Sequence, residues 1–169
     1  PAGMRFTLQV SQFDCTSCGS CADVCPADAL SMEPAKLTDA SRGLWEYGLS
    51  LADKGRVFDP FTVKGSQFKQ PLLEFSAACA GCGETPYAKL LTQLFGDRVY
   101  WANATGCSQA WGSPFPGIPY TANKRGFGPA WTNSLFENNA ELSLGLYLGS
   151  TQQRAAEKAR VEKLVKVLA

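Results

Sequence analysis

Cysteines are the residues of this chain with the greatest capacity for chemistry, and they fall into two groups. The chain of 169 residues contains seven cysteines and no histidine. The first group has the spacing Cys-x2-Cys-x2-Cys-x3-Cys-Pro and consists of Cys15, Cys18, Cys21 and Cys25, followed by Pro26. Thiolates at this spacing on one short loop reach the corners of a compact cube, so the pattern predicts a [4Fe–4S] cluster.

Disulfides and zinc are the alternatives for this first group. Seven is an odd number of cysteines, and neighbouring Cys-x2-Cys pairs are poor disulfide partners. A structural zinc site usually takes two separated pairs rather than four cysteines in one short run. The spacing therefore favours an iron–sulfur cluster over both.

The fourth cysteine of the run has a separate role in the pattern. In two-cluster ferredoxins of the bacterial type, the fourth cysteine ligates the other cluster. We therefore predict that Cys15, Cys18 and Cys21 bind one cluster while Cys25 points toward a different one. The chain has no second run of this kind, so the ligands that complete both clusters must lie outside it.

The second group consists of Cys79, Cys82 and Cys107, and 24 residues separate Cys82 from Cys107. By itself this spacing fits zinc, an iron–sulfur cluster or a redox dithiol. The first group makes a cluster the favoured interpretation, and again a fourth ligand is missing.

Composition excludes several other kinds of chemistry. Without histidine there is no Ser-His-Asp or Cys-His catalysis and no His-ligated zinc. A net charge of +1 argues neither for nor against nucleic acid or membrane as partner, and we expect neither. No apolar stretch of about 18 residues and no signal peptide is visible. Clustered cysteines without a signal peptide fit a reducing compartment such as the cytoplasm.

The elements around the first group resemble half of a ferredoxin fold. Alternating apolar residues predict a strand over residues 4–10, and residues 29–32 would form the returning strand. Residues 34–75 contain scattered proline and glycine. We interpret them as a surface connection with little regular structure beyond a short helix near residues 44–51.

An α/β region is predicted after the connection. Thr85 as cap and Pro86 at the first position begin a helix that ends at Gly96, and a buried strand follows over residues 99–102. Residues 134–137 have the pattern of a capping box for a second helix. From Thr151 onward the composition predicts an amphipathic surface helix, with its apolar face formed by Val161, Leu164, Val165 and Leu168.

The long segment over residues 103–131 is expected to be functional rather than disordered. Cys107 follows the predicted strand, and ligands of α/β sheets bind beyond the carboxyl ends of strands. The aromatic side chains of the segment are expected to pack in the core rather than contact substrate: Trp111, Phe115, Tyr120, Phe127 and Trp131.

Several stretches closely resemble the pyruvate:ferredoxin oxidoreductases. They are residues 63–68 (VKGSQF), 79–87 (CAGCGETPY), 91–98 (LTQLFGDR), 102–107 (ANATGC) and 128–137 (GPAWTNSLFE). The resemblance implies an α/β fold class with three parts. Residues 1–33 would be the second half of a two-cluster ferredoxin domain, residues 34–75 a connecting segment, and residues 76–169 the beginning of a thiamine diphosphate-binding domain.

The resemblance also implies site residues and a reaction. Cys79, Cys82 and Cys107 would ligate the cluster nearest the thiamine, and Glu84 and Cys107 would contact thiamine diphosphate; no catalytic residue is assigned. Glu84 has a simpler interpretation as a carboxylate in the first turn of a helix. The implied reaction is oxidative decarboxylation of pyruvate with coenzyme A to acetyl-CoA and CO2. Electrons would leave through [4Fe–4S] clusters to ferredoxin or flavodoxin, in a homodimeric enzyme of the cytoplasm or of the matrix of an anaerobic organelle.

The chain departs from the family pattern in ways that matter. The Gly-Asp-Gly motif that holds Mg²⁺ is absent, since Gly96 and Asp97 are followed by Arg98, so the Mg²⁺ ligands must lie elsewhere. The first ferredoxin half, the pyruvate and coenzyme A domains and the last cluster cysteine are also missing. We expect a segment of the enzyme, or one chain of a split form, that does not turn over alone. The alternatives are an iron–sulfur electron carrier or interaction module, a related 2-oxo acid oxidoreductase, and a structural zinc protein.

Overall fold

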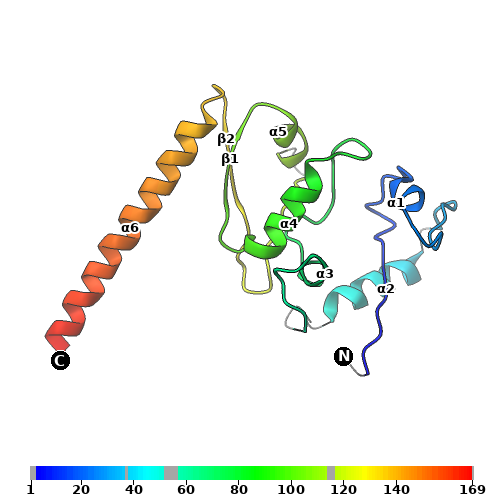
Figure 1. Cartoon of the computed structure of the whole chain (residues 1–169), viewed down its shortest axis with the longest axis horizontal. Coiled ribbons are helices and arrows are strands. Elements are labelled where there is room, and N and C mark those ends of the chain that lie inside the picture. Colours follow the sequence, from blue (N-terminus) through cyan, green and yellow to red (C-terminus); the bar gives the residue numbers. More distant parts are fainter. Residues whose placement is uncertain (1–2, 37, 52–56, 114–116, 169) are drawn as a thin grey trace.

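The computed structural model describes residues 3–36, 38–51, 57–113 and 117–168. Within these ranges the chain forms six helices and two strands. In chain order they are α1 (Ser20–Asp23), α2 (Asp39–Ser50), α3 (Val63–Ser66), α4 (Thr85–Phe95), β1 (Tyr100–Ala104), α5 (Cys107–Gly112), β2 (Ala130–Ser134) and α6 (Asn139–Leu168). Figure 1 shows α4 and α5 on one side of the strands and α6 on the other. The expected α/β class is confirmed as a small mixed region.

The N-terminal segment differs from its prediction. Neither residues 4–10 nor residues 29–32 form a strand, and Phe6 and Leu8 are exposed. A strand needs a second backbone to accept and donate its hydrogen bonds, and no segment among the described residues pairs with either stretch. The alternating apolar residues over 4–10 therefore form an apolar face, but no strand among the described residues pairs with this segment. The single turn α1 lies inside the cysteine run and follows Gly19, whose φ is +78°.

Helix α2 confirms the predicted short helix but begins earlier. The Thr38 hydroxyl accepts a hydrogen bond from the backbone N–H of Ser41 at 3.1 Å, and the Ser41 hydroxyl accepts one from the N–H of Thr38 at 3.0 Å. This reciprocal pair satisfies two donors at the helix start. Serine replaces the usual glutamate of a capping box, which explains why the sequence pattern was missed.

The end of the connecting segment belongs to the core and is not a surface linker. Leu72 and Leu73 are 4% and 3% exposed. The Thr92 hydroxyl of α4 accepts hydrogen bonds from the backbone N–H groups of both, each at 3.1 Å. Leu73 also forms an isolated antiparallel bridge with Tyr120. The end of the connecting segment therefore packs against α4, the helix that follows it in the sequence.

Helix α4 begins and ends close to the predicted positions, with a different cap. Glu84 rather than Thr85 is the cap residue, Pro86 lies in the first turn, and the helix ends before Gly96. The Thr85 side chain is buried, and its hydroxyl accepts a hydrogen bond from the Ser76 hydroxyl at 3.2 Å. Thr85 is therefore used for packing against the preceding loop.

Strands β1 and β2 form a two-stranded parallel sheet. In register, Trp101 lies opposite Trp131 and Asn103 opposite Asn133. The predicted strand over residues 99–102 is confirmed as β1, but it is not a buried strand, because Tyr100 is exposed and the other residues of β1 are only partly buried. The long segment after it is not structureless, because it contains α5 and the start of β2.

The core lies between α4, α5 and the sheet. Buried Leu73, Ala88 and Trp111 form its centre, with Trp101 and Tyr120 packed against them. The expected packing role is confirmed for Trp111 and is wrong for Phe127, which is 55% exposed. Tyr120 and Trp131 are partly buried, and Phe115 lies outside the described residues.

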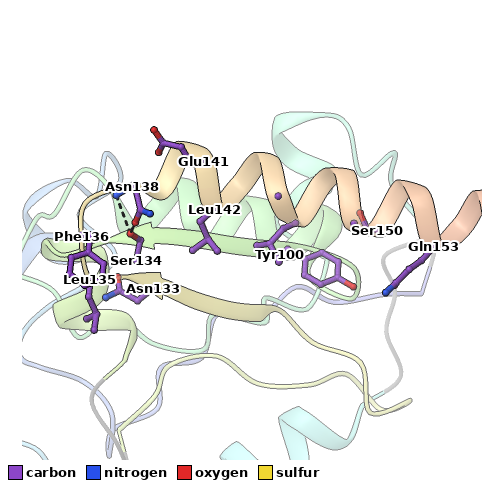
Figure 2. A pocket seen from close by; sticks show the side chains of 13 residues that line it. Tyr100, Asn133, Ser134, Leu135, Phe136, Asn138, Glu141, Leu142, Ser150 and Gln153 are labelled. Carbon is purple, nitrogen blue, oxygen red and sulfur yellow. Dashed lines mark hydrogen bonds between the residues drawn. The ribbon is translucent and has the colours of Figure 1, made fainter.

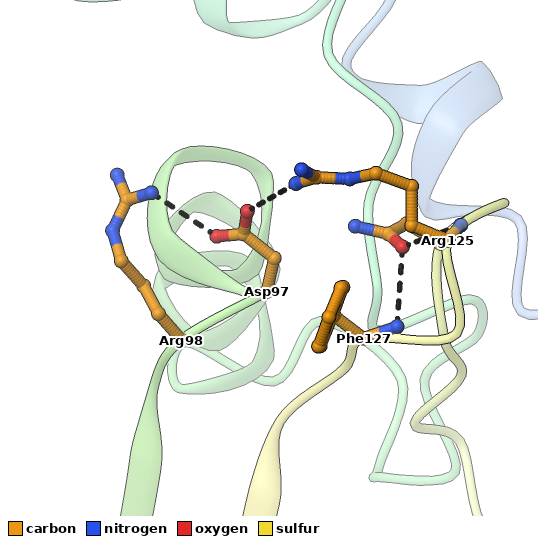
Figure 3. A network of polar contacts seen from close by, with 5 residues as sticks. Asp97, Arg98, Arg125 and Phe127 are labelled. Atoms are coloured by element: carbon orange, nitrogen blue, oxygen red, sulfur yellow. Dashed lines mark hydrogen bonds and ion pairs between the residues drawn. The ribbon is translucent and has the colours of Figure 1, made fainter.

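A polar network at the corner between α4 and β1 holds the loop that precedes β2. Asp97 accepts from Arg98 and from Arg125, each at 3.2 Å, and the Arg125 guanidinium lies 5.5 Å from the centre of the Phe127 ring (Figure 3). Both arginines are well exposed to solvent, so each ion pair contributes little, on the order of 0.2–1 kcal/mol.

Helix α6 begins at Asn139, so the predicted capping box over residues 134–137 is wrong. Ser134 ends β2, and its hydroxyl accepts a hydrogen bond from the backbone N–H of Asn138 at 3.0 Å. Glu137 has a φ of +57°, which no helix start at Ser134 would allow. The surface helix expected from Thr151 is the C-terminal part of α6, and its apolar residues are exposed.

Candidate functional site

The first cysteine group surrounds the short turn α1. Cys15, Cys18 and Cys21 are exposed, and Cys25 is partly buried. The Cys25 sulfur accepts a hydrogen bond from the backbone N–H of Ala29 at 3.4 Å. Backbone N–H groups of Ala29 and Ala27 lower the pKa of the Cys25 thiol, and the hydroxyl and N–H of Ser20 lower that of Cys18. A local fold that favours thiolates suits metal ligation, because the thiolate is the form that binds metal.

The second cysteine group lies where α4 and α5 begin. Cys79 and Cys82 occupy the turn before α4, and Cys107 is the first residue of α5. The Cys82 sulfur accepts a hydrogen bond from the backbone N–H of Glu84 at 3.4 Å. Backbone N–H groups of Thr85 and Glu84 lower the pKa of the Cys82 thiol. Unpaired N–H groups at the start of α4 thus face the sulfur, as expected for a helix start.

The structure does not draw these sulfurs into a closed ligand set. All seven cysteines are free thiols. Among the described residues, no three cysteine, aspartate or glutamate side chains lie close enough together to hold a metal ion. The assignment of three cysteines to each cluster, with Cys25 on a different one, therefore stays a prediction.

Glu84 makes a contact that the sequence did not predict. Its side chain makes no capping hydrogen bond to α4. Instead, the Glu84 Oε2 atom accepts a hydrogen bond from the Trp111 Nε1–H group at 3.2 Å. The two residues are 27 positions apart, and no local pattern signals such a pair. Trp111, expected only to pack, also donates a hydrogen bond to a candidate site residue.

Tyr120 completes the surroundings of this carboxylate. Its ring centre lies 6.2 Å from that of Trp111 and 6.1 Å from that of Trp101. Burial and, secondarily, the negative charge of Glu84 raise the pKa of Tyr120 to about 12. We call Glu84, Trp111 and Tyr120 the carboxylate cluster.

The residues present fit part of what the resemblance implies. Thiolates are the usual ligands of iron–sulfur clusters, and the cysteine sulfurs of both groups accept backbone hydrogen bonds of the kind that tune such clusters. An exposed carboxylate held at the start of α4 is suited to a polar contact with thiamine diphosphate.

A groove lined by described residues lies apart from this site. It has a volume of about 830 Å³ and lies between the strands and α6 (Figure 2). Tyr100, Asn133, Leu142 and Gln153 are among its lining residues, and no cysteine and no member of the carboxylate cluster lines it. We therefore do not assign the chemistry to the groove.

Among the described residues, none of the helices combines the length and apolar character needed to cross a membrane.

Comparison with known proteins identifies the first cysteine group. Residues 8–31 match the family model of the 4Fe-4S binding domain. All four cysteines of the run lie in this range, so the segment is a [4Fe–4S] binding segment.

Relatives extend the similarity to most of the chain. The pyruvate-flavodoxin oxidoreductase of Enterobacter agglomerans is 62% identical over 146 residues, which is 85% of this chain and 12% of the relative. The pyruvate:ferredoxin oxidoreductase of Moorella thermoacetica is 56% identical over 156 residues, covering 90% of this chain and 13% of the relative. The pyruvate dehydrogenase [NADP(+)] of Cryptosporidium parvum is 57% identical over 150 residues, covering 88% of this chain and 8% of the relative. By sequence, this chain is similar to one segment of the pyruvate-flavodoxin and pyruvate:ferredoxin oxidoreductases, and it spans about an eighth of their length.

Proposed function

We propose that this chain carries cysteine ligands of the [4Fe–4S] clusters that transfer electrons, and part of the thiamine diphosphate site, of an enzyme that oxidises pyruvate. The observation that carries the proposal is the 62% identity over 146 residues, which extends far beyond the short 4Fe-4S binding segment. A stand-alone electron carrier would account for residues 8–31 alone. A structural zinc protein would account for neither the family match nor the long identity.

The proposed reaction balances as follows. Pyruvate and coenzyme A give acetyl-CoA, CO2 and a proton, and two electrons are released. When bound, thiamine diphosphate supplies the electron sink that makes loss of CO2 possible. The electrons leave one at a time through [4Fe–4S] clusters to ferredoxin or flavodoxin.

Specific residues of this chain have proposed roles. Cys15, Cys18 and Cys21 hold one cluster, and Cys25 ligates another. Cys79, Cys82 and Cys107 hold the cluster nearest the thiamine, and Glu84 and Cys107 contact the cofactor. Support comes from the lowered thiol pKa values of Cys18, Cys25 and Cys82, and from the fixed Glu84 carboxylate. We assign residues 76–169 to the start of the thiamine diphosphate domain, with residues 1–33 and 34–75 as the ferredoxin half and the connection.

The remaining ligands are proposed to come from the rest of the enzyme, which includes the Mg²⁺ ligands and the cysteines that close each cluster. A homodimeric complete enzyme in the cytoplasm, or in the matrix of an anaerobic organelle, belongs to the same proposal.

The test uses the full-length protein that carries this segment, purified without oxygen. We expect reduction of ferredoxin or flavodoxin that requires pyruvate and coenzyme A together. Omission of coenzyme A serves as the control for non-specific reduction. Equal or faster reduction with another 2-oxo acid, such as 2-oxoglutarate, would reassign the substrate. Electron acceptance from reduced ferredoxin without any 2-oxo acid reaction would favour the electron-carrier alternative.

A further inference from the structure

We propose that Trp111 is a positioning residue for the cofactor site, because its indole N–H fixes the direction in which the Glu84 carboxylate points. The inference rests on the function proposed above, in which Glu84 contacts thiamine diphosphate. It adds a residue of this chain that does not itself touch the cofactor.

The hydrogen bond between the two side chains is directional. Trp111 Nε1 lies 3.2 Å from Glu84 Oε2, and indole has a single donor with no freedom to rotate independently of its ring. Glu84 is exposed and makes no capping bond to its own helix, so the backbone of α4 does not hold the carboxylate. Among the described residues, the Trp111 indole is the hydrogen-bond donor that the structure gives this carboxylate.

The indole is itself immobilised. Trp111 is 4% exposed and packs in the core with Leu73 and Ala88, and the Tyr120 ring lies beside it at an interplanar angle of 47°. A glutamate side chain has several rotamers, and each contact with a ligand requires that one be selected. A rigid donor that selects this rotamer in advance lowers the cost of ligand binding.

The same hydrogen bond joins two parts of the second cysteine group. Glu84 lies two residues after Cys82, and Trp111 lies on α5, which begins at Cys107. The bond therefore links the turn before α4 to the helix that begins at Cys107. Loss of the bond would loosen the carboxylate and this link together.

The chain offers matched controls for this indole. Trp101 Nε1 and Trp131 Nε1 are buried, and neither has a hydrogen-bond partner among the described residues. Replacing Trp131 by phenylalanine removes a comparable ring and an N–H that bonds nothing. A defect due only to the smaller ring should therefore appear in both Trp111→Phe and Trp131→Phe.

The experiment measures the affinity of the complete apoenzyme for thiamine diphosphate by calorimetry. We expect Trp111→Phe to weaken the affinity about tenfold, the size expected for loss of one hydrogen bond to a charged group. Trp131→Phe should change the affinity for thiamine diphosphate less than about twofold, because its indole N–H makes no hydrogen bond that could be lost. In a Glu84→Leu background, Trp111→Phe should cause no further loss. Thermal unfolding and iron content are measured for each variant, so that a loss of affinity can be distinguished from a loss of folding or of clusters.

A second measurement leaves the core intact. Ultraviolet resonance Raman spectra report whether an indole N–H is hydrogen-bonded, and Glu84→Leu keeps Trp111 in place. We expect one tryptophan of this variant to lose its hydrogen-bonded signature. An unchanged spectrum would overturn the proposed contact even if Trp111→Phe failed to fold.

The possible failures are distinguishable. If Glu84→Leu leaves both cofactor affinity and turnover unchanged, the proposed role of Glu84 at the cofactor is wrong. If Glu84→Leu weakens binding but Trp111→Phe behaves like Trp131→Phe, only the positioning role is overturned. If Trp111→Phe weakens binding equally in the Glu84→Leu background, Trp111 acts through packing, which also overturns the proposal.

Discussion

The two cysteine-bearing regions of this molecule differ in the contacts that hold them, which are local in sequence in the first and long-range in the second. Residues 3–36 contain no buried side chain, and each contact around their sulfurs is made between near neighbours in the sequence. The region from residue 69 to residue 134 is held by contacts between distant residues, such as Thr92 with Leu73 and Trp111 with Glu84. The first region therefore contributes no buried residue of its own, whereas the second contains the buried core formed by Leu73, Ala88 and Trp111.

This difference has an energetic cause. A short loop that buries little apolar surface cannot offset the entropy of ordering its backbone. In small metal-binding domains, the free energy of metal binding is also the free energy of folding. We infer that cluster loss unfolds the first region, while loss of a cluster ligand in the second leaves its core folded.

The largest expected effect comes from removing single ligands in the first region. Cys18→Ser and Cys25→Ser in the complete enzyme should each abolish one cluster, and the two clusters should differ. Electron paramagnetic resonance of the reduced variants would show different missing signals. Ser20→Ala, which removes only the hydroxyl beside Cys18, is the matched control and should retain both clusters. Identical losses in the two cysteine variants would contradict the split ligation.

A ligand of the second region should affect electron flow while sparing the fold. Cys82→Ser should slow electron exit to ferredoxin on the order of a hundredfold, equivalent to about 2.7 kcal/mol of barrier. Pyruvate affinity should change much less, because the core beside α4 does not depend on this sulfur. Stopped-flow reduction of ferredoxin and equilibrium pyruvate binding separate the two quantities. Equal losses in both would show that the cluster also shapes the substrate site.

A cavity in the core of the second region should lower the free energy of unfolding. Leu73→Ala removes a side chain that is 3% exposed and contacts Ala88 and Trp111 in the core. We expect a loss of about 2–5 kcal/mol in the free energy of unfolding. Leu144→Ala on the exposed face of α6 is the control, with an expected change below about 0.5 kcal/mol. Urea unfolding of the complete enzyme, followed by tryptophan fluorescence, measures both.

The smallest effect is a loss of stability at high pH. The pKa of Tyr120 is about 12 in the folded chain, above its ordinary value of about 10. The folded state therefore holds this proton more tightly than the unfolded state. The stabilisation is complete below about pH 10 and is lost as the pH rises toward 12. Tyr120→Phe should flatten this part of the pH dependence of the unfolding free energy, and an unchanged pH dependence in this variant would contradict the account.

Local patterns predicted those elements that local interactions build. The helix α4 has Pro86 in its first turn and Gly96 after its last residue, and both are local signals. The strand β1 and the C-terminal part of α6 are indicated by their own composition. Strand β2 was missed because its identity depends on pairing with β1, about 30 residues earlier. The strand over residues 4–10 was wrongly predicted because alternation describes a face but does not supply a partner.

The candidate site divides in the same way. Spacing alone predicted the 4Fe-4S binding segment, because the motif itself is local. Glu84 came from resemblance, and its partner Trp111 could not be predicted, because a contact across 27 residues leaves no trace in a single sequence. The buried end of the connection at Leu72 and Leu73 was missed for the same reason.

The most direct test is anomalous scattering at the iron edge from crystals of the complete enzyme. We predict one cluster-sized peak touching the sulfurs of Cys15, Cys18 and Cys21, with Cys25 on a separate peak. A further peak should touch Cys79, Cys82 and Cys107, beside Glu84. A zinc signal at either group, or one cluster that binds all four cysteines of the first run, would contradict this assignment.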